Sequence, residues 1–108
     1  MEKYTVQMTE EALSDMEDIY RYIAEKLLSP ENALGQYNRI ADEILTLDMF
    51  PARYRVVEFE PERSAELRRM LVDNYSVFYV IHGNRVIVTN VLYSASDIEQ
   101  RIKAEPHR

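Results

Sequence analysis

The chain has 108 residues and no cysteine, with 46% hydrophobic residues, 30% charged residues and a formal net charge of −6 at pH 7. This composition is typical of one globular domain over residues 1–108, and it excludes disulfide scaffolds, thiolate metal sites and cysteine nucleophiles. No apolar run reaches the roughly 18 residues of a membrane span and no signal-peptide core precedes Met8, so we expect a cytoplasmic protein with no membrane partner.

The first residues predict a short strand that leads into a long helix. Residues 4–8 alternate between apolar and polar side chains, which is the pattern of a half-buried strand. Thr9 then offers its hydroxyl as a helix N-cap, and the acids at positions 10 and 11 suit the first turn. One apolar stripe continues to Leu27, which indicates a helix of about five turns.

A second helix is expected almost immediately afterwards. Ser29 is a typical N-cap residue, and Pro30 is favoured at the first helical position. The apolar stripe of this helix continues to Leu47, and Pro51 then forces the helix to stop. Because the link between the two helices is so short, they must fold back on each other as an antiparallel hairpin.

The second half of the chain predicts strands, because the hydrophobic period changes after Pro51. The expected strands cover residues 53–59, 67–72, 75–81 and 86–93. Asp73-Asn74 and the segment 82–84 are suited to the tight turns between the last three strands. The last two strands are apolar on both faces, as central strands covered on both sides are.

A short final helix completes the expected order of elements. Ser96 and Glu99 match a capping box that opens a helix through Ile98 and Ile102, and the tail from Pro106 is expected to fray. A strand, two helices, antiparallel strands and a short helix define an α+β domain with an antiparallel β-meander.

Five stretches spread over nearly the whole chain carry a resemblance to a known family. They are residues 4–9 leading into Ala12, residues 18–24, residues 50–54, Arg68-Arg69 before residues 72–79, and residues 91–93 followed by Ser96-Asp97. Together with the order of the expected elements, these stretches resemble the RelE/ParE superfamily of toxins from bacterial type II toxin–antitoxin pairs.

The resemblance implies a toxin that arrests growth, contributes to plasmid stabilisation and is neutralised by direct binding of a cognate antitoxin. RelE-like members cut mRNA on the ribosome as metal-independent endoribonucleases, whereas ParE-like members poison DNA gyrase. The antitoxins of such pairs have a segment that wraps around the toxin and folds as it docks. A further hypothesis is a protein that has lost toxicity and only binds antitoxin in an autoregulatory complex.

Two departures from the family pattern favour gyrase over ribosome-bound mRNA as the target. Ser76 stands where RelE-like nucleases commonly carry an arginine, and residues 94–96 lack the arginine that many members have before the aspartate. RNA cleavage requires cations aimed at the phosphate, and each such donor is worth about 10²–10³ in rate. The two long helices are also more similar to ParE-like members than to RelE-like members.

The candidate site residues come mainly from a group of five arginines that fall within seventeen residues. Arg68 and Arg69 are adjacent on an expected strand, so they point to opposite faces and only one of them can line a groove. In an endoribonuclease they would stabilise the scissile phosphate, and Arg53 and Arg55 would bind the nucleic acid or another target. The alternative is that these arginines are exposed and pair with neighbouring glutamates such as Glu66.

Tyr93, at the end of the last expected strand, is the third candidate catalytic residue. Its ring would stack on a base or its hydroxyl would move a proton; alternatively, it is an amphipathic lid of the core. No metal or cofactor is expected. His82 and His107 have no second ligand at metal spacing, and two glycines, at positions 35 and 83, cannot form a phosphate-binding loop.

The charge is divided unequally between the two halves of the chain. Residues 1–50 hold eleven acids and four bases, whereas residues 51–108 hold eight acids and nine bases. The signal for nucleic acid is therefore weak, because phosphate contacts depend on positive charge. Most antitoxins are acidic where they meet a basic toxin. For this acidic chain we expect an antitoxin segment that carries lysines and arginines.

Overall fold

The computed structural model describes residues 3–104 of the chain. In chain order the elements are β1 (Thr5–Met8), α1 (Glu10–Arg21), the π-helical turn η1 (Tyr22–Lys26), α2 (Pro30–Leu45), the 3₁₀ turns η2 (Thr46–Asp48) and η3 (Pro51–Arg53), β2 (Arg68–Val72), β3 (Tyr75–His82), β4 (Arg85–Tyr93) and α3 (Ile98–Ala104). The expected fraying from Pro106 and the position of His107 lie outside the described residues. Between residues 3 and 104, no helix has the length and apolarity that crossing a membrane requires.

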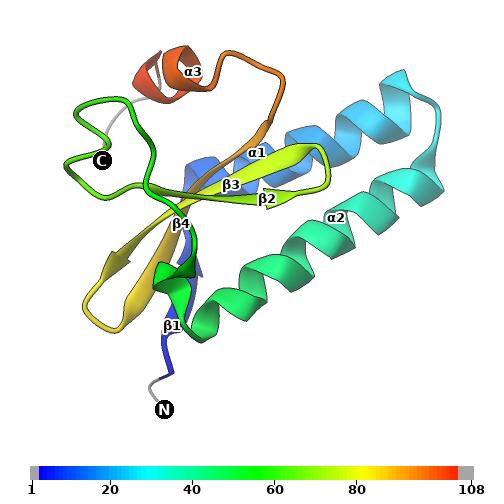
Figure 1. Cartoon of the computed structure of the whole chain (residues 1–108). Helices are drawn as coiled ribbons and strands as arrows, with labels where there is room; N and C mark the ends of the chain where they lie inside the picture. Colours follow the sequence, from blue (N-terminus) through cyan, green and yellow to red (C-terminus); the bar gives the residue numbers. More distant parts are fainter. Residues whose placement is uncertain (1–2, 105–108) are drawn as a thin grey trace.

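The four strands form one sheet in the order β1-β4-β3-β2. β2, β3 and β4 make the expected antiparallel meander, and β1 joins the edge parallel to β4 with Val6 opposite Val86. Figure 1 shows α1 and α2 as a long pair that extends beyond the strands, with α3 at a different side of the sheet. The predicted α+β architecture, with its helical hairpin, meander and short final helix, is confirmed.

Two apolar clusters cover the two faces of the central strands. The larger cluster lies between the helical hairpin and the sheet, and Met16, Ile40 and Val77 belong to it. The smaller cluster lies on the opposite face, where Ile98 of α3 packs with Phe78. The sequence neighbours Val77 and Phe78 are both 0% exposed but belong to different clusters, which confirms that this strand is covered on both sides.

The turn of the hairpin is more irregular than the sequence predicts. The first helix does not stay α-helical to Leu27, because η1 replaces its last turn and the amide of Leu27 donates to the carbonyl of Tyr22 at 3.3 Å. Leu28 then adopts a left-handed conformation with φ of 51°. The amide of Ser29 donates to the carbonyl of Ile23 at 3.2 Å, which closes the turn. These contacts fix the backbone at the tip of the hairpin.

The helix caps confirm one prediction and correct two. Thr9 caps α1 as expected, since its hydroxyl accepts from the amide of Ala12 at 3.1 Å. Ser29 occupies the N-cap position of α2, but its side chain makes no capping hydrogen bond. The predicted Ser96–Glu99 capping box is wrong. Ser96 instead donates its hydroxyl and its amide to the carbonyl of Tyr93, which closes a turn and delays the start of α3.

The predicted strand over residues 53–59 is also wrong. Its first residue belongs to η3, and only an isolated bridge between Val56 and Arg68 joins this segment to β2. Two backbone bonds support the bridge, from Val57 to Leu67 at 2.8 Å and from Arg69 to Arg55 at 3.0 Å. Beyond Val57 the chain turns away to place apolar side chains over the smaller cluster, so the ladder stops.

Candidate functional site

Arg68 and Arg69 point to opposite faces of the sheet, as their adjacent positions on β2 require. The guanidinium of Arg68 donates to the carbonyls of Ala52 at 3.2 Å and Tyr54 at 2.6 Å, and it lies 3.9 Å from the carboxylate of Glu66. Its side chain is only 18% exposed. Arg68 therefore fastens the segment after η3 to the sheet, and its donors point into the protein rather than toward a ligand.

Arg53 is likewise occupied by contacts within the protein. Its guanidinium donates to the carbonyl of Met49 at 2.6 Å, to the carbonyl of Phe50 at 3.0 Å and to the hydroxyl of Thr46 at 3.0 Å. It also lies over the ring of Tyr54, 4.7 Å from its centroid. A cation suits carbonyls at a helix C-terminus, so this side chain stabilises the end of the helical hairpin.

Arg69 lies on the face opposite the helical hairpin. Its Nε donates to the hydroxyl of Ser76 at 2.9 Å, and the oxygens of Ser76 and Ser94 are 2.8 Å apart. Arg55 lies opposite Arg69 in the short ladder and therefore shares this face. The side chain of Arg55 is exposed and makes no hydrogen bond or ion pair to another described residue.

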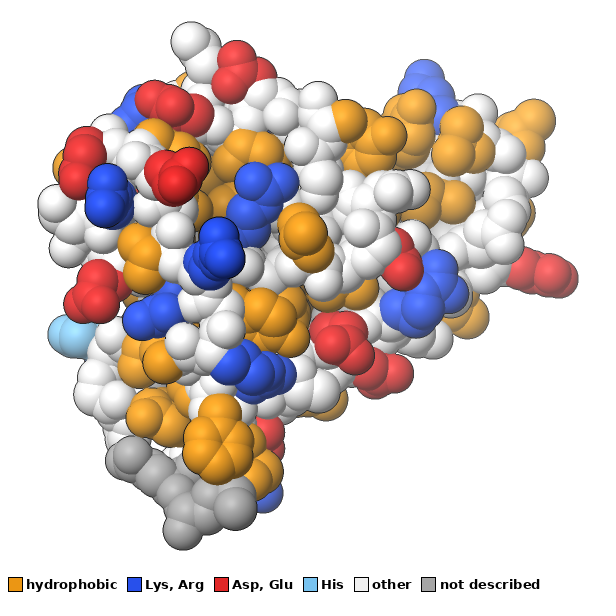
Figure 2. Space-filling model, in the orientation of Figure 1, with side chains coloured by type: hydrophobic (Ala, Val, Ile, Leu, Met, Phe, Trp, Pro, Cys, Tyr) orange, Lys and Arg blue, Asp and Glu red, His pale blue; other side chains and the backbone are white. Residues whose placement is uncertain are grey.

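Figure 2 shows that basic side chains gather over the side of the molecule that carries β2 and the loop before it. On the face that Arg55 and Arg69 share, the guanidinium of Arg69 is linked through Ser76 to the hydroxyl of Ser94. We call Arg55, Arg69 and Ser94 the basic face. It offers cationic donors and a hydroxyl, which is the chemistry that binds a phosphate or a carboxylate.

Tyr93 lies far from these arginines. Its side chain is 48% exposed, and its ring packs edge-on against Tyr75 with 5.7 Å between the centroids. Tyr75 packs against the cluster under the helical hairpin, so the two tyrosines lie on that side of the sheet. Arg68 lies opposite Tyr79, and Tyr93 lies opposite Tyr75. Because Tyr75 and Tyr79 are four residues apart on β3, Arg68 and Tyr93 are separated by about 13 Å along the strand direction. The three candidate catalytic side chains are therefore not brought together.

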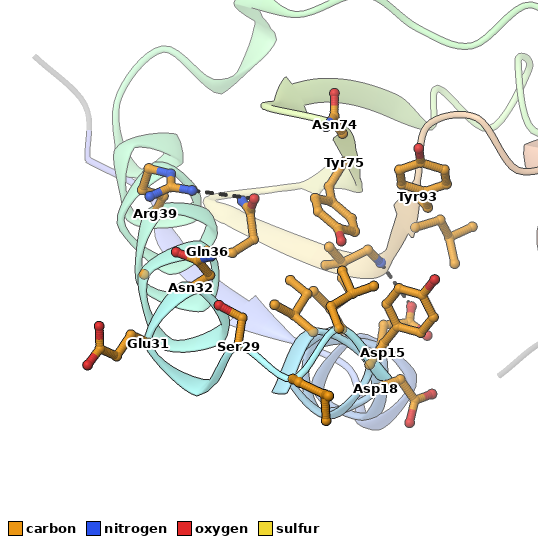
Figure 3. Close-up of a pocket in the computed structure, with 18 of the residues that line it drawn as sticks. Asp15, Asp18, Ser29, Glu31, Asn32, Gln36, Arg39, Asn74, Tyr75 and Tyr93 are labelled. Carbon is orange, nitrogen blue, oxygen red and sulfur yellow. Dashed lines mark hydrogen bonds between the residues drawn. The ribbon is translucent and has the colours of Figure 1, made fainter. Parts of the chain in front are cut away.

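A groove of about 1060 Å³ lies between the helical hairpin and the ends of β3 and β4. Figure 3 shows Tyr75 and Tyr93 at the sheet side of this groove, with α1 and α2 forming the opposite walls. Its other apolar lining residues include Tyr22, Leu27 and Leu28 at the hairpin turn. We call this hollow the hairpin groove.

The polar groups of the hairpin groove have different environments. Asp15 is buried, and its carboxylate accepts a hydrogen bond from the amide of Val91 at 2.9 Å. Val91 lies on a part of β4 that does not pair with β1, so Asp15 has a structural role there. Arg39 is 2.8 Å from Asp73, and its hydrogen bond is the main reason why the pKa of that carboxyl is lowered. Asp18 is 67% exposed and lies on the α1 side.

Burial raises the pKa of Tyr75, and the nearby phenols of Tyr93 and Tyr22 raise it further. Tyr75 therefore remains a neutral hydroxyl at physiological pH, and the effect of Tyr93 and Tyr22 on it indicates that three aromatic side chains share this end of the groove. Among residues 3–104, no three His, Asp or Glu side chains are close enough to hold a metal ion.

The sequence reasoning did not predict the hairpin groove. One signal was available: Leu28 and Tyr22 fall outside the apolar stripe of the first helix, so the core does not account for them. Leu28 is 83% exposed and Tyr22 is 56% exposed. Their place in the groove follows from the left-handed turn, which periodicity does not predict.

The observed order of a strand, a helical hairpin and an antiparallel meander is the one that the resemblance to the RelE/ParE superfamily of toxins predicts. The family described as the ParE toxin of the type II toxin–antitoxin system parDE matches residues 6–98, and the chain belongs to this family. No curated protein sequence is a match for the chain.

Three solved structures share the fold at low sequence identity. A chain of the chromosomal ParDE system from P. aeruginosa has a TM-score of 0.71 and 18% identity, with 84% of this chain and 96% of that chain covered. A chain of the RelBE2 toxin–antitoxin complex from Mycobacterium tuberculosis has a TM-score of 0.62 and 17% identity, covering 84% and 98%. A chain of the archaeal RelE–RelB complex from Pyrococcus horikoshii OT3 has a TM-score of 0.59 and 14% identity, covering 86% and 97%.

Proposed function

We propose that this chain arrests bacterial growth in the cytoplasm when it is expressed alone, and that a cognate antitoxin neutralises it by direct binding. Membership of the ParE toxin family supports this proposal. Two of the solved relatives are described as complexes of a toxin with its antitoxin or of RelE with RelB, which supports a protein partner of the same kind.

The proposed target is DNA gyrase, which the chain inhibits by binding rather than by catalysis. The observation that carries this choice is the dispersal of the candidate catalytic side chains. A nuclease without a metal ion needs several donors that converge within about 3 Å of one phosphate. Arg68 donates to backbone carbonyls, and Arg69 and Tyr93 lie on opposite faces of the sheet. A binding inhibitor needs no such convergence.

The test is a cleavage-complex assay with the purified chain, gyrase and supercoiled plasmid. A gyrase poison traps the enzyme on cut DNA, so linear plasmid should accumulate after denaturation of the protein. A parallel reaction with a topoisomerase of a different mechanism should show no linear DNA. Growth arrest without linear DNA in the gyrase reaction would refute this choice of target.

A second candidate is cleavage of ribosome-bound mRNA, which the basic face supports. Arg55 and Arg69 lie on one face beside the hydroxyl of Ser94, and the RNA backbone is a suitable anion for them. The test is a map of new RNA 5′ ends within translated frames, minutes after induction. If this candidate is correct, Arg69→Ala should abolish the new ends and leave antitoxin binding intact.

The third hypothesis, a non-toxic module that binds only antitoxin, makes a different prediction in the same two assays. Induction of the chain alone should then cause neither growth arrest nor new RNA ends, whereas the chain should still co-purify with its antitoxin. Growth arrest of any kind would exclude this hypothesis.

A further inference from the structure

Phe50 is exposed to solvent in a backbone conformation that an aromatic residue rarely adopts. Its φ of 49° and ψ of 51° lie in the left-handed region, and the residue is 64% exposed. A bulky residue in this region is an outlier, and the proline that follows also disfavours helical backbone here. Pro51 itself is buried, so the chain turns the proline inward and the aromatic ring outward. Burial of the ring therefore does not explain the strain.

The other left-handed residues of the described chain have different surroundings. Asp73 is paired with Arg39 at 2.8 Å, Glu66 has a polar side chain that is 75% exposed, and Leu28 lines the hairpin groove. Phe50 alone among them is aromatic, and within residues 3–104 no other ring or cation packs on it. Its exposure is therefore the feature that needs a physical reason.

The backbone around this exposed ring is fixed by side-chain hydrogen bonds. The carbonyls of residues 49–52 and that of residue 54 all accept from side chains, and the donors are Arg53, Tyr79 and Arg68. Strained backbone persists only where its surroundings over-determine it, and such strain is concentrated at functional sites. These contacts hold the ring in one place before any partner arrives, so binding costs it little conformational freedom.

A protein partner fits this residue better than a nucleic acid does. A ring that stacks on a base is usually accompanied by cations that hold the phosphate backbone. Here the guanidinium of Arg53 already donates to carbonyls of the turn, and Lys3 lies 3.9 Å from the carboxylate of Asp48. An exposed aromatic side chain that is held in place is typical of the anchor residues that enter an apolar pocket of a partner protein.

We propose that Phe50 is the anchor residue through which this chain binds gyrase, with its ring inserted into an apolar pocket of that protein. This inference rests on the proposed function, which names gyrase as the target. The turns that carry Phe50 follow α2 at the end of that helix opposite the hairpin tip (Figure 1), so the ring is not part of the hairpin groove. The antitoxin is the other protein partner, and the experiment separates the two.

The experiment compares the full chain with Phe50→Ala and Phe50→Gly in the gyrase cleavage-complex assay and in thermal unfolding. Both variants should need a concentration about 30-fold higher or more for the same yield of linear plasmid, as loss of an anchor residue requires. Because glycine tolerates left-handed backbone, Phe50→Gly should keep the Tm or raise it by roughly 2–6 °C. Phe50→Leu keeps an apolar side chain and should recover part of the lost activity.

Two controls separate the anchor from its exposure and from its strain. Leu34→Ala truncates an apolar residue of α2 that is 53% exposed, and it should change the yield of linear plasmid by less than about threefold. Glu66→Gly relieves a left-handed residue with φ of 59°. It should keep or raise the Tm as Phe50→Gly does, but without loss of cleavage complexes.

The outcomes separate failure of this inference from failure of the proposed function. If the unchanged chain traps gyrase and the Phe50 variants trap it equally well, only the inference fails. A fall of more than about 5 °C in the Tm of Phe50→Gly would assign the residue to the fold, and variants that no longer co-purify with the antitoxin would assign it to that partner. Either result overturns the inference. If the unchanged chain yields no linear plasmid, the gyrase proposal fails and the inference fails with it.

Discussion

The two neighbouring arginines of β2 should differ in their effect on stability. Arg68 donates to the carbonyls of Ala52 and Tyr54, at 3.2 and 2.6 Å, from a side chain that is only 18% exposed. Hydrogen bonds to charged groups contribute about 1.5–3 kcal/mol each. Because one partly hydrated guanidinium makes both bonds, Arg68→Ala should lower the free energy of unfolding by about 2–4 kcal/mol. That loss corresponds to a fall of roughly 10–20 °C in Tm for a domain of this size.

Arg69→Ala is the matched comparison. It removes one hydrogen bond, to the hydroxyl of Ser76 at 2.9 Å, and the contact with the ring of Phe78 at 5.7 Å, and should cost about 1.5 kcal/mol, because the side chain is partly hydrated. Urea unfolding followed by circular dichroism measures both variants, and Arg68→Lys should lie between them because it keeps one donor. Equal losses for the two alanine variants would refute the structural role of Arg68. A fully stable Arg68→Ala that no longer arrests growth would instead place Arg68 at the target.

Three further predictions concern polar side chains that hydrogen-bond to the backbone. Burial raises the pKa of Tyr79 to about 12 from 10.0, so the folded state retains this proton to higher pH than the unfolded state does. Stability should therefore fall by about 2 kcal/mol as pH rises from 10 to 12. Tyr79→Phe should remove this dependence, although loss of the hydrogen bond to the carbonyl of Pro51 lowers stability at neutral pH by about 1–2 kcal/mol; urea unfolding across this pH range checks both effects. Asp15→Ala should cost about 1–3 kcal/mol because the buried amide of Val91 loses its acceptor, and Asp15→Asn should restore most of that loss in the same assay. Thr9→Ala should cost about 1 kcal/mol through the loss of the α1 cap, measured as a shift in thermal unfolding.

The parts of the fold that the sequence predicts correctly depend on local patterns. Ala12 and Ile40 lie on the predicted stripes of the two helices, and both are fully buried. The meander follows from short turns between apolar runs. The strand expected over residues 53–59 fails because its alternation has a different cause. Val57 is buried because it packs in the smaller cluster with α3. The residues before it are held by η3 and by hydrogen bonds from Arg53 and Arg68 to backbone carbonyls.

The candidate site was less predictable because it depends on where irregular backbone runs. Alternation along β2 predicts that Arg68 and Arg69 diverge, but it does not say which of them is committed to the fold. That depends on the carbonyls of residues 52 and 54, in a segment without periodicity. The hairpin groove depends on the left-handed backbone at Leu28, a conformation that a leucine rarely adopts and that no residue pattern here predicts.

The division of charge between surfaces matters more for partner choice than the net charge of −6. Two of the five arginines in residues 53–69, Arg53 and Arg68, donate to backbone carbonyls, and their charge stabilises the fold. Arg55 and part of Arg69 lie on the basic face, whereas most of the acids belong to the helical half of the chain, where residues 10–48 hold ten acids and three bases. A partner that approaches one face is separated by the sheet from the charges on the other. An acidic chain can therefore still offer a small cationic surface to an anionic target, because no single partner meets the averaged charge.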